Sequence, residues 1–188
     1  MLIAKPDFKS VFRFLNASEI RFVVVGGIAA GILGEPRATT DVDIITFMPK
    51  EDLDGFLRFA GKKKVKLSEK LIRKNAYSDA FFRVYIAGTQ VDFILGESDF
   101  EFQVLTRAIK GKLYGVKIPV ASPEDMILMK LVSGRALDLI DAKAIKLRYG
   151  KKLDDGYIEK WGKRLKVQRG RGHVIEHWKK LLKSGYRE

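Results

Sequence analysis

Two aspartates stand in a stretch of sequence that otherwise has the pattern of a buried strand. Asp41 and Asp43 lie two residues apart in the apolar run 41–47. Side chains alternate between the faces of a strand, so both carboxylates point the same way. An ionised carboxylate in an apolar setting is costly unless it is paired, hydrogen-bonded or bound to a metal. The spacing favours a site for Mg²⁺ or Mn²⁺, whose preferred ligands are carboxylate oxygens. The alternative is an edge strand with two solvated acids.

A third acid, Asp92, interrupts the apolar run 91–95. Val91 and Phe93 share one face of this strand, and Asp92 takes the other. If the hairpin predicted over 81–95 lies beside the first strand, the three carboxylates converge. That arrangement suits two-metal phosphoryl transfer: Asp41 and Asp43 hold the ions, and Asp92 completes the site and assists deprotonation of the attacking hydroxyl.

Gly26 and Gly27 follow an apolar strand and lead into a short helix predicted over 28–33. Glycines allow a backbone to approach a ligand closely, and the free N–H groups at a helix start attract anions. The pair is therefore a candidate phosphate cradle, with a tight structural turn as the alternative. The glycine spacing does not match the G-x-G-x-x-G pattern of dinucleotide-binding proteins.

These residues must be positioned by alternating strands and helices. Apolar periodicity predicts strands over 21–25, 41–47, 81–87, 89–95 and 113–120. It predicts helices over 7–17, 28–33, 50–60, 99–109, 122–132, 137–147, 154–165 and 172–182. The basic stretch 61–75 is expected to form a strand edge and a short helix. Ser122 and Pro123 are typical of an N-cap and a first helical position.

Composition narrows the classes of function. The 188 residues carry a net charge of +13, and from Ala142 onward there are 15 Lys or Arg against 5 Asp or Glu. A field of that sign favours a polyanionic partner such as RNA, or is simply a solvated basic surface. Absence of cysteine excludes disulfides and thiol catalysis, and the two histidines, His173 and His177, are expected at the surface. With no apolar run of about 18 residues, we expect no membrane partner and a cytoplasmic protein. The Lys-rich, Cys-free composition leans towards a thermophile.

The combined pattern resembles a known superfamily. It is similar to the pattern found in the nucleotidyltransferases that include DNA polymerase beta. The matching residues are Gly26-Gly27, then Arg37-x-Thr39-x-Asp41-Val42-Asp43, then an acid on a later strand. It most resembles the minimal branch around AbiEii-type toxins, whose helices also resemble segments 122–125 and 135–141. The resemblance implies an α/β (α+β) fold, a mixed sheet flanked by helices with a helical C-terminal part. We expect an α/β core over 1–120 and a helical region over 121–188, packed as one compact unit.

The resemblance also implies roles for further residues. Backbone N–H groups of Gly26 and Gly27 would bind the triphosphate, although many relatives have Gly-Ser there. The other nucleotide-binding residues implied are Arg37, Thr39, Lys130 and Arg135. Arg37 alternatively pairs with an acid such as Glu35, and Thr39 alternatively caps the turn into the strand. Asp138 and Asp141 are expected on a helix as polar-face residues or salt-bridge partners.

The implied activity is transfer of a nucleoside monophosphate from an NTP to an acceptor hydroxyl, with release of pyrophosphate. The presence of all three acids favours a metal-dependent enzyme. The alternative is a catalytically silent nucleotide- or RNA-binding module of the same fold, related to toxin–antitoxin systems. The basic C-terminal third favours tRNA as the acceptor, while a protein side chain or an aminoglycoside-like molecule stays open.

Overall fold

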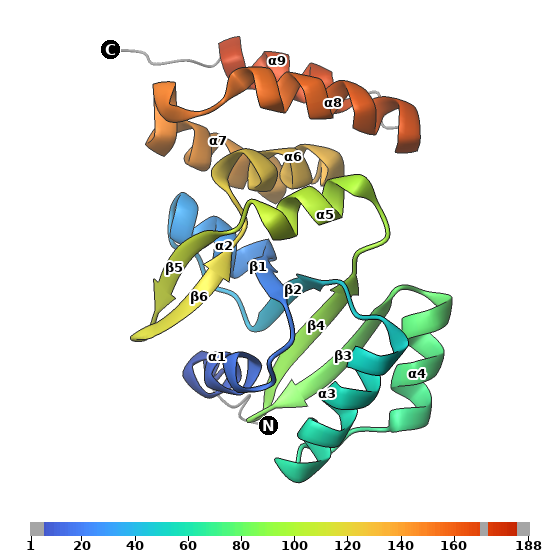
Figure 1. Ribbon diagram of the computed structural model, residues 1–188. Helices are drawn as coiled ribbons and strands as arrows, with labels where there is room; N and C mark the ends of the chain where they lie inside the picture. The colour runs from blue at the N-terminus through green and yellow to red at the C-terminus, as the bar shows by residue number, and fades with distance from the viewer. Residues whose placement is uncertain (1–5, 170–172, 184–188) are drawn as a thin grey trace. The chain divides into compact units, whose positions relative to one another are not determined.

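The computed structural model describes residues 6–169 and 173–183. It confirms a mixed α/β fold with a helical C-terminal part (Figure 1). The chain divides into two compact units. The first contains Met1–Ile28 and Ala38–Ala121, and the second contains Ala29–Arg37 and Ser122–Glu188. One of the three boundaries thus falls within helix α2 (Gly26–Leu33), whose first residues belong to the first unit.

A six-stranded mixed sheet forms the first unit, with strand order β3-β4-β2-β1-β6-β5. The strands are β1 (Phe22–Val25), β2 (Asp41–Thr46), β3 (Phe81–Ile86), β4 (Thr89–Leu95), β5 (Ile109–Leu113) and β6 (Val116–Val120). β1 is a central strand, and its four residues, all apolar, are buried. β2 runs antiparallel to β1 and parallel to β4, so it lies between the strand that precedes the glycine pair and the strand that carries Asp92.

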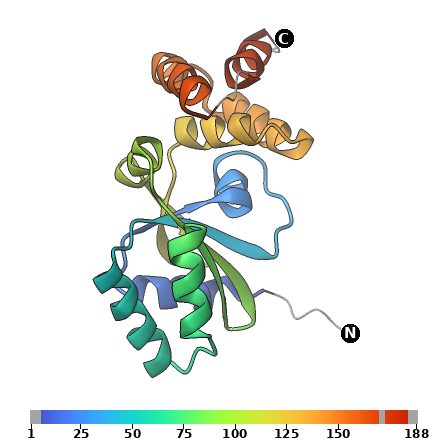
Figure 2. The same cartoon turned by 90° about the vertical axis from the view of Figure 1, so that its right-hand side faces the viewer.

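Apolar side chains fill one face of this part of the sheet. Phe82 of β3 and Phe93 of β4 stack with ring centroids 4.5 Å apart, and Phe56 lies 5.0 Å from Phe93. Phe56 comes from α3 (Lys50–Lys62), which lies beside α4 (Glu69–Ser78) in Figures 1 and 2. The other helices of the unit are α1 (Phe8–Ala17) and α5 (Asp99–Thr106). Side chains alternate along a strand. The face of the sheet opposite this phenylalanine cluster therefore carries the odd-numbered residues of β3 and the even-numbered residues of β4.

The second unit is helical. It contains α6 (Pro123–Ser133), α7 (Ala136–Tyr149), a 3₁₀ turn (Gly150–Lys152), α8 (Asp155–Arg169) and α9 (His173–Lys183). As the sequence predicts, Ser122 caps α6, its hydroxyl accepting a hydrogen bond from the Asp125 N–H at 3.2 Å. Gly134 ends α6 with a left-handed φ of 67°. Figure 2 shows α8 and α9 lying against the α6–α7 layer. No helix in the described ranges combines the length and apolar character of a membrane span.

Two sequence predictions of local structure were wrong. A single strand was predicted over 113–120 after a helix reaching Ile109, whereas β5 and β6 form a hairpin that begins at Ile109. The turn residues are Tyr114 and Gly115, and both have positive φ. Tyrosine rarely adopts this conformation, so the residue types of the turn did not predict it. The second error is the strand edge expected within 61–75, where the structure has the end of α3, a loop and the start of α4.

Candidate functional site

The three predicted acids converge on one face of the sheet. The pairing of β2 with β4 sets Asp43 directly beside Asp92, and Asp41 lies two residues before Asp43 on the same face. Each of the three offers a carboxylate oxygen, and these oxygens all lie within 4.8 Å of one another. Asp41 and Asp43 are half-buried, and Asp92 is buried. The structure therefore brings together a set of hard oxygen donors suited to a divalent cation.

Arg83 compensates the buried charge of Asp92. Its Nε donates to Oδ1 at 2.6 Å and its Nη2 donates to Oδ2 at 2.9 Å. The hydrogen bond to Asp92 raises the pKa of the Arg83 guanidinium. Gln90 adds a donor, with its Nε2 3.3 Å from Asp92 Oδ2. Asp92 thus has no uncompensated charge before any ion binds.

Thr39 and Gly26 support the other two acids. The Thr39 hydroxyl donates to Asp41 Oδ1 at 2.7 Å, so it orients this carboxylate. Gly26 has φ of 64°, and a Cβ built there would lie 1.9 Å from Asp43 Oδ2. Only glycine fits, because both the backbone conformation and the space beside Asp43 exclude a side chain. Gly27 is buried as the second residue of α2.

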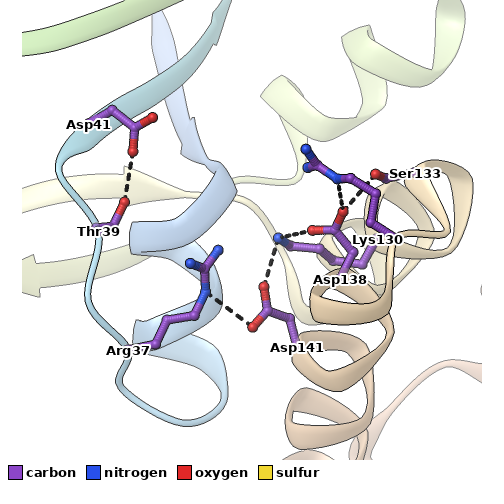
Figure 3. A network of polar contacts seen from close by, with 8 residues as sticks. Arg37, Thr39, Asp41, Lys130, Ser133, Asp138 and Asp141 are labelled. Atoms are coloured by element: carbon purple, nitrogen blue, oxygen red, sulfur yellow. Dashed lines mark hydrogen bonds and ion pairs between the residues drawn. The ribbon is translucent and has the colours of Figure 1, made fainter.

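The remaining candidate residues belong to the second unit and form an ion-pair network there (Figure 3). Lys130 is 5% exposed, and its Nζ lies 2.7 Å from Asp138 Oδ1 and 2.8 Å from Asp141 Oδ2. Arg135 Nε is 2.6 Å from Asp138 Oδ2, and Arg37 Nε is 3.2 Å from Asp141 Oδ1. Asp138 and Asp141 thus each form salt bridges with these cations, which is one of the two roles expected for them. Arg37 pairs with Asp141 and not with Glu35, the acid suggested from the sequence.

Asp138 is the electrostatic centre of this network. Burial alone would raise the pKa of its carboxyl, but hydrogen bonds from Lys130, Ser133 and Arg135 outweigh burial and lower the pKa to about 2. Such a network holds the end of α6 against the start of α7 across the Gly134 turn. The prediction that Lys130, Arg135 and Arg37 bind nucleotide phosphates stays a prediction, since each of these cations has an acidic partner within its own unit.

The basic C-terminal helices keep their aromatic residues inside. Trp161 and Trp178 are buried, so they pack the helices together and do not offer a stacking surface. Lys163, Arg164 and the pair Lys179-Lys180 are exposed. Arg171 lies outside the described residues. His173 and His177 were expected at the surface, but both are half-buried, with rings 5.2 Å apart and His173 Nε2 3.2 Å from the Val132 carbonyl.

Sequence reasoning missed Arg83 and Gln90. The signal was available, because a two-residue turn at Ala87-Gly88 pairs position 83 with position 92 across the hairpin. A directly opposed basic residue is what a buried aspartate on that face requires.

Comparison with known proteins assigns the chain to a family. Residues 4–175 match the family described as "Nucleotidyl transferase of unknown function (DUF2204)". The chain belongs to this family and, with it, to the nucleotidyltransferase superfamily. The narrower AbiEii-like assignment stays a prediction. No curated protein matches the sequence significantly.

Two solved structures of one protein, ANT(2'')-Ia, share the fold. The solution structure of the antibiotic-resistance factor ANT(2'')-Ia has a TM-score of 0.58 at 13% identity and covers 88% of this chain and 95% of its own. Its crystal structure in complex with adenylyl-2''-tobramycin has a TM-score of 0.55 at 13% identity, covering 84% and 95%. A proposed nucleotidyltransferase from Thermotoga maritima is 19% identical, with a TM-score of 0.41 and coverage of 85% and 89%.

Proposed function

We propose that this protein transfers a nucleoside monophosphate from an NTP to an acceptor hydroxyl, with a divalent cation held by Asp41, Asp43 and Asp92. One observation carries the proposal: the three carboxylate oxygens lie within 4.8 Å of one another on adjacent strands. The residues fit a cation, since every donor is an oxygen, and the missing Cβ at Gly26 makes room for the Asp43 carboxylate against the backbone. Membership of a nucleotidyl transferase family supports the same chemistry.

The reaction forms a bond between the acceptor oxygen and the α-phosphorus of the NTP, and breaks the bond from that phosphorus to the bridging oxygen of pyrophosphate. A bound Mg²⁺ or Mn²⁺ would polarise the phosphate and offset the developing negative charge. Asp92 takes the proton of the acceptor hydroxyl. Arg83 donates to both oxygens of Asp92, but each carboxylate oxygen has two acceptor sites, so Oδ1 can accept the proton while it keeps the hydrogen bond from Nε. Backbone N–H groups at Gly26 and Gly27 would bind the triphosphate.

The acceptor is proposed to be a polyanion, with tRNA favoured. The net charge of +13 and the exposed cations of α8 and α9 support this choice. ANT(2'')-Ia, which shares the fold, has been solved with an adenylylated tobramycin. A polycationic aminoglycoside suits this chain poorly as an acceptor, because the positive field would repel it.

The test is label transfer. The protein is incubated with each α-³²P-labelled NTP, with Mg²⁺ or Mn²⁺, and with total tRNA, total protein or tobramycin as acceptor. We expect label on RNA, none without the metal, and none with the Asp41→Asn, Asp43→Asn double variant. Calorimetry of Mg–NTP binding separates the alternatives. Binding that the double variant loses, without turnover on any acceptor, would indicate the silent module, and equal NTP affinity in the double variant would refute the site.

A further inference from the structure

A groove of about 420 Å³ lies between α4 and β3 in the first unit. β3 is an edge strand of the sheet, and Figure 1 shows α4 alongside it. The side chains that give the groove its character are Lys66, Leu71, Asn75, Phe81, Arg83 and Tyr85. A volume of this size is typical of ligand pockets. Of its lining residues, the function proposed above involves only Arg83.

The lining combines exposed apolar surface with hydrogen-bond donors. Leu71 is 55% exposed and Tyr85 is 56% exposed, although both have large side chains that are usually covered. Phe81 and Tyr85 project on the same side of β3, one on each side of Arg83. None of the described residues that line the groove is acidic. An exposed ring in a groove whose described lining includes Lys66 and Arg83 and no acid favours a flat, electron-rich and negatively charged partner over a cationic one.

A basic segment runs along the same groove. Residues 61–75 contain seven Lys or Arg against one Glu. Lys70 and Lys74 are exposed and lie four positions apart, so they form a stripe on α4 next to the Leu71–Asn75 stripe that lines the groove. The Arg73 guanidinium is engaged with Asp54 and Glu69, whereas the lysines of the segment form no ion pair with any acid in the described part of the chain. The charge therefore suits a chain of phosphates.

The groove leads to the carboxylate triad through Arg83. Arg83, Asp92 and Asp43 are directly opposed on three adjacent strands, and Tyr85, Gln90 and Asp41 form the next row. Neighbouring strands are about 4.8 Å apart, so each row spans roughly 10 Å from β3 to β2. A group that ends beside Tyr85 is thus within one nucleotide's reach of the acids.

We propose that this α4–β3 groove binds a single-stranded RNA 3′ end, with a base stacked on Tyr85 and the backbone phosphates along Lys66, Lys70 and Lys74. A single strand is required because a duplex does not offer an unstacked base face to an aromatic side chain. The assignment of this RNA as the acceptor rests on the function proposed above. RNA binding itself does not, since it needs neither NTP nor metal.

Fluorescence anisotropy of a short labelled single-stranded RNA with a free 3′ hydroxyl tests the proposal. A triple variant should reduce the steepness of log K against log salt by about 2, because each phosphate neutralised on a single strand adds about 0.7 to it. Its substitutions are Lys66→Gln, Lys70→Gln and Lys74→Gln. Tyr85→Ala should weaken binding about tenfold, and Tyr85→Phe should stay near wild type because the ring remains. The matched control is Lys110→Gln, Lys112→Gln, Lys117→Gln, which removes the same charge from the exposed β5–β6 hairpin.

Each outcome of these measurements supports or overturns the proposed groove. A control triple variant that weakens binding as much as the groove variant, or a Tyr85→Ala variant that binds normally, overturns the groove. So does RNA binding lost only when Lys163 and Arg164 of α8 are replaced by Gln. Groove-dependent RNA binding without label transfer upholds the inference and contradicts the proposed activity. Label transfer to a protein or small molecule without groove-dependent RNA binding supports the proposed activity and overturns the groove inference.

Discussion

Arg83 and Asp92 form a two-pronged ion pair across the β3–β4 hairpin, with N–O distances of 2.6 and 2.9 Å. Asp92 is buried, whereas the Arg83 side chain is 45% exposed. The pair therefore neutralises a buried acid from the solvent side. It also means that a cation approaching Asp92 competes with a cation that is already present.

Replacing Arg83 should strengthen metal binding. In Arg83→Gln, Asp92 loses its positive partner and the triad loses a neighbouring charge, so we expect Mn²⁺ to bind about fivefold more tightly at low salt. Electron paramagnetic resonance of free Mn²⁺ measures this directly. Lys112→Gln, which removes a charge from the β5–β6 hairpin, should have no effect. Weaker Mn²⁺ binding in Arg83→Gln would show that Arg83 supports the site by shaping it and not by competing for it.

Asp92→Asn should separate binding from chemistry. The amide keeps the size of the side chain but cannot take a proton from the acceptor hydroxyl. We expect turnover to fall by about 10²-fold or more, the usual scale for general-base catalysis, with Mg–NTP affinity changed little. Single-turnover label transfer and calorimetry measure the two quantities. Unchanged turnover would reduce Asp92 to a buried polar residue paired with Arg83.

Gly26→Ala should damage the site beyond its cost in backbone strain. An alanine at φ of 64° costs roughly 1–2 kcal/mol, and its Cβ would also meet Asp43 Oδ2 at 1.9 Å. Gly88 has φ of 75° and no atom within 4 Å of a built Cβ, so Gly88→Ala carries the strain alone. We expect both variants to lose stability in urea denaturation, but only Gly26→Ala to lose Mn²⁺ binding. Equal Mn²⁺ affinity in the two variants would contradict the close approach of Gly26 to Asp43.

Acid should weaken the second unit through Asp138. Its carboxyl has a pKa of about 2 in the folded chain against an ordinary value of 3.8, so the unfolded chain binds the proton first as pH falls. The stabilisation is complete above about pH 4 and is lost as pH falls to about 2, amounting to roughly 2 kcal/mol. Urea denaturation at several pH values should give a shallower acid dependence for Asp138→Asn than for wild type. Asp155→Asn, at an exposed position, is the control. Identical acid profiles for wild type and Asp138→Asn would refute the network's role.

The sequence predicted most elements because their signals are local. The period of apolar residues marked nearly every helix, and Ser122-Pro123 marked the start of α6 within one residue. Convergence of the three acids was also predictable once the hairpin was placed beside β2. These inferences need only alternation along strands and the pairing of neighbours.

The partners of the acids were less accessible. Arg37 and Asp141 are 104 positions apart, and no local pattern connects them. Lys130 reaches Asp138 and Asp141 only because Gly134 turns the chain between α6 and α7. Glu35 was the nearest acid in sequence to Arg37, but proximity along a loop does not bring charges together. Tertiary ion pairs depend on how helices pack, which single-residue types do not specify.

The division of the chain has a consequence for any attempt to cut it. Because Ala29–Arg37 belongs with the helices after Ser122, the polypeptide crosses between the units three times. Arg148 donates to the carbonyl oxygens of Ile32 and Gly34 at 3.1 and 3.0 Å, and Arg37 pairs with Asp141. A fragment ending at residue 121 would leave one segment without its partners, and a fragment starting at 122 would lack that segment. The two units must therefore be expressed together, and function should be dissected by point substitution and not by truncation.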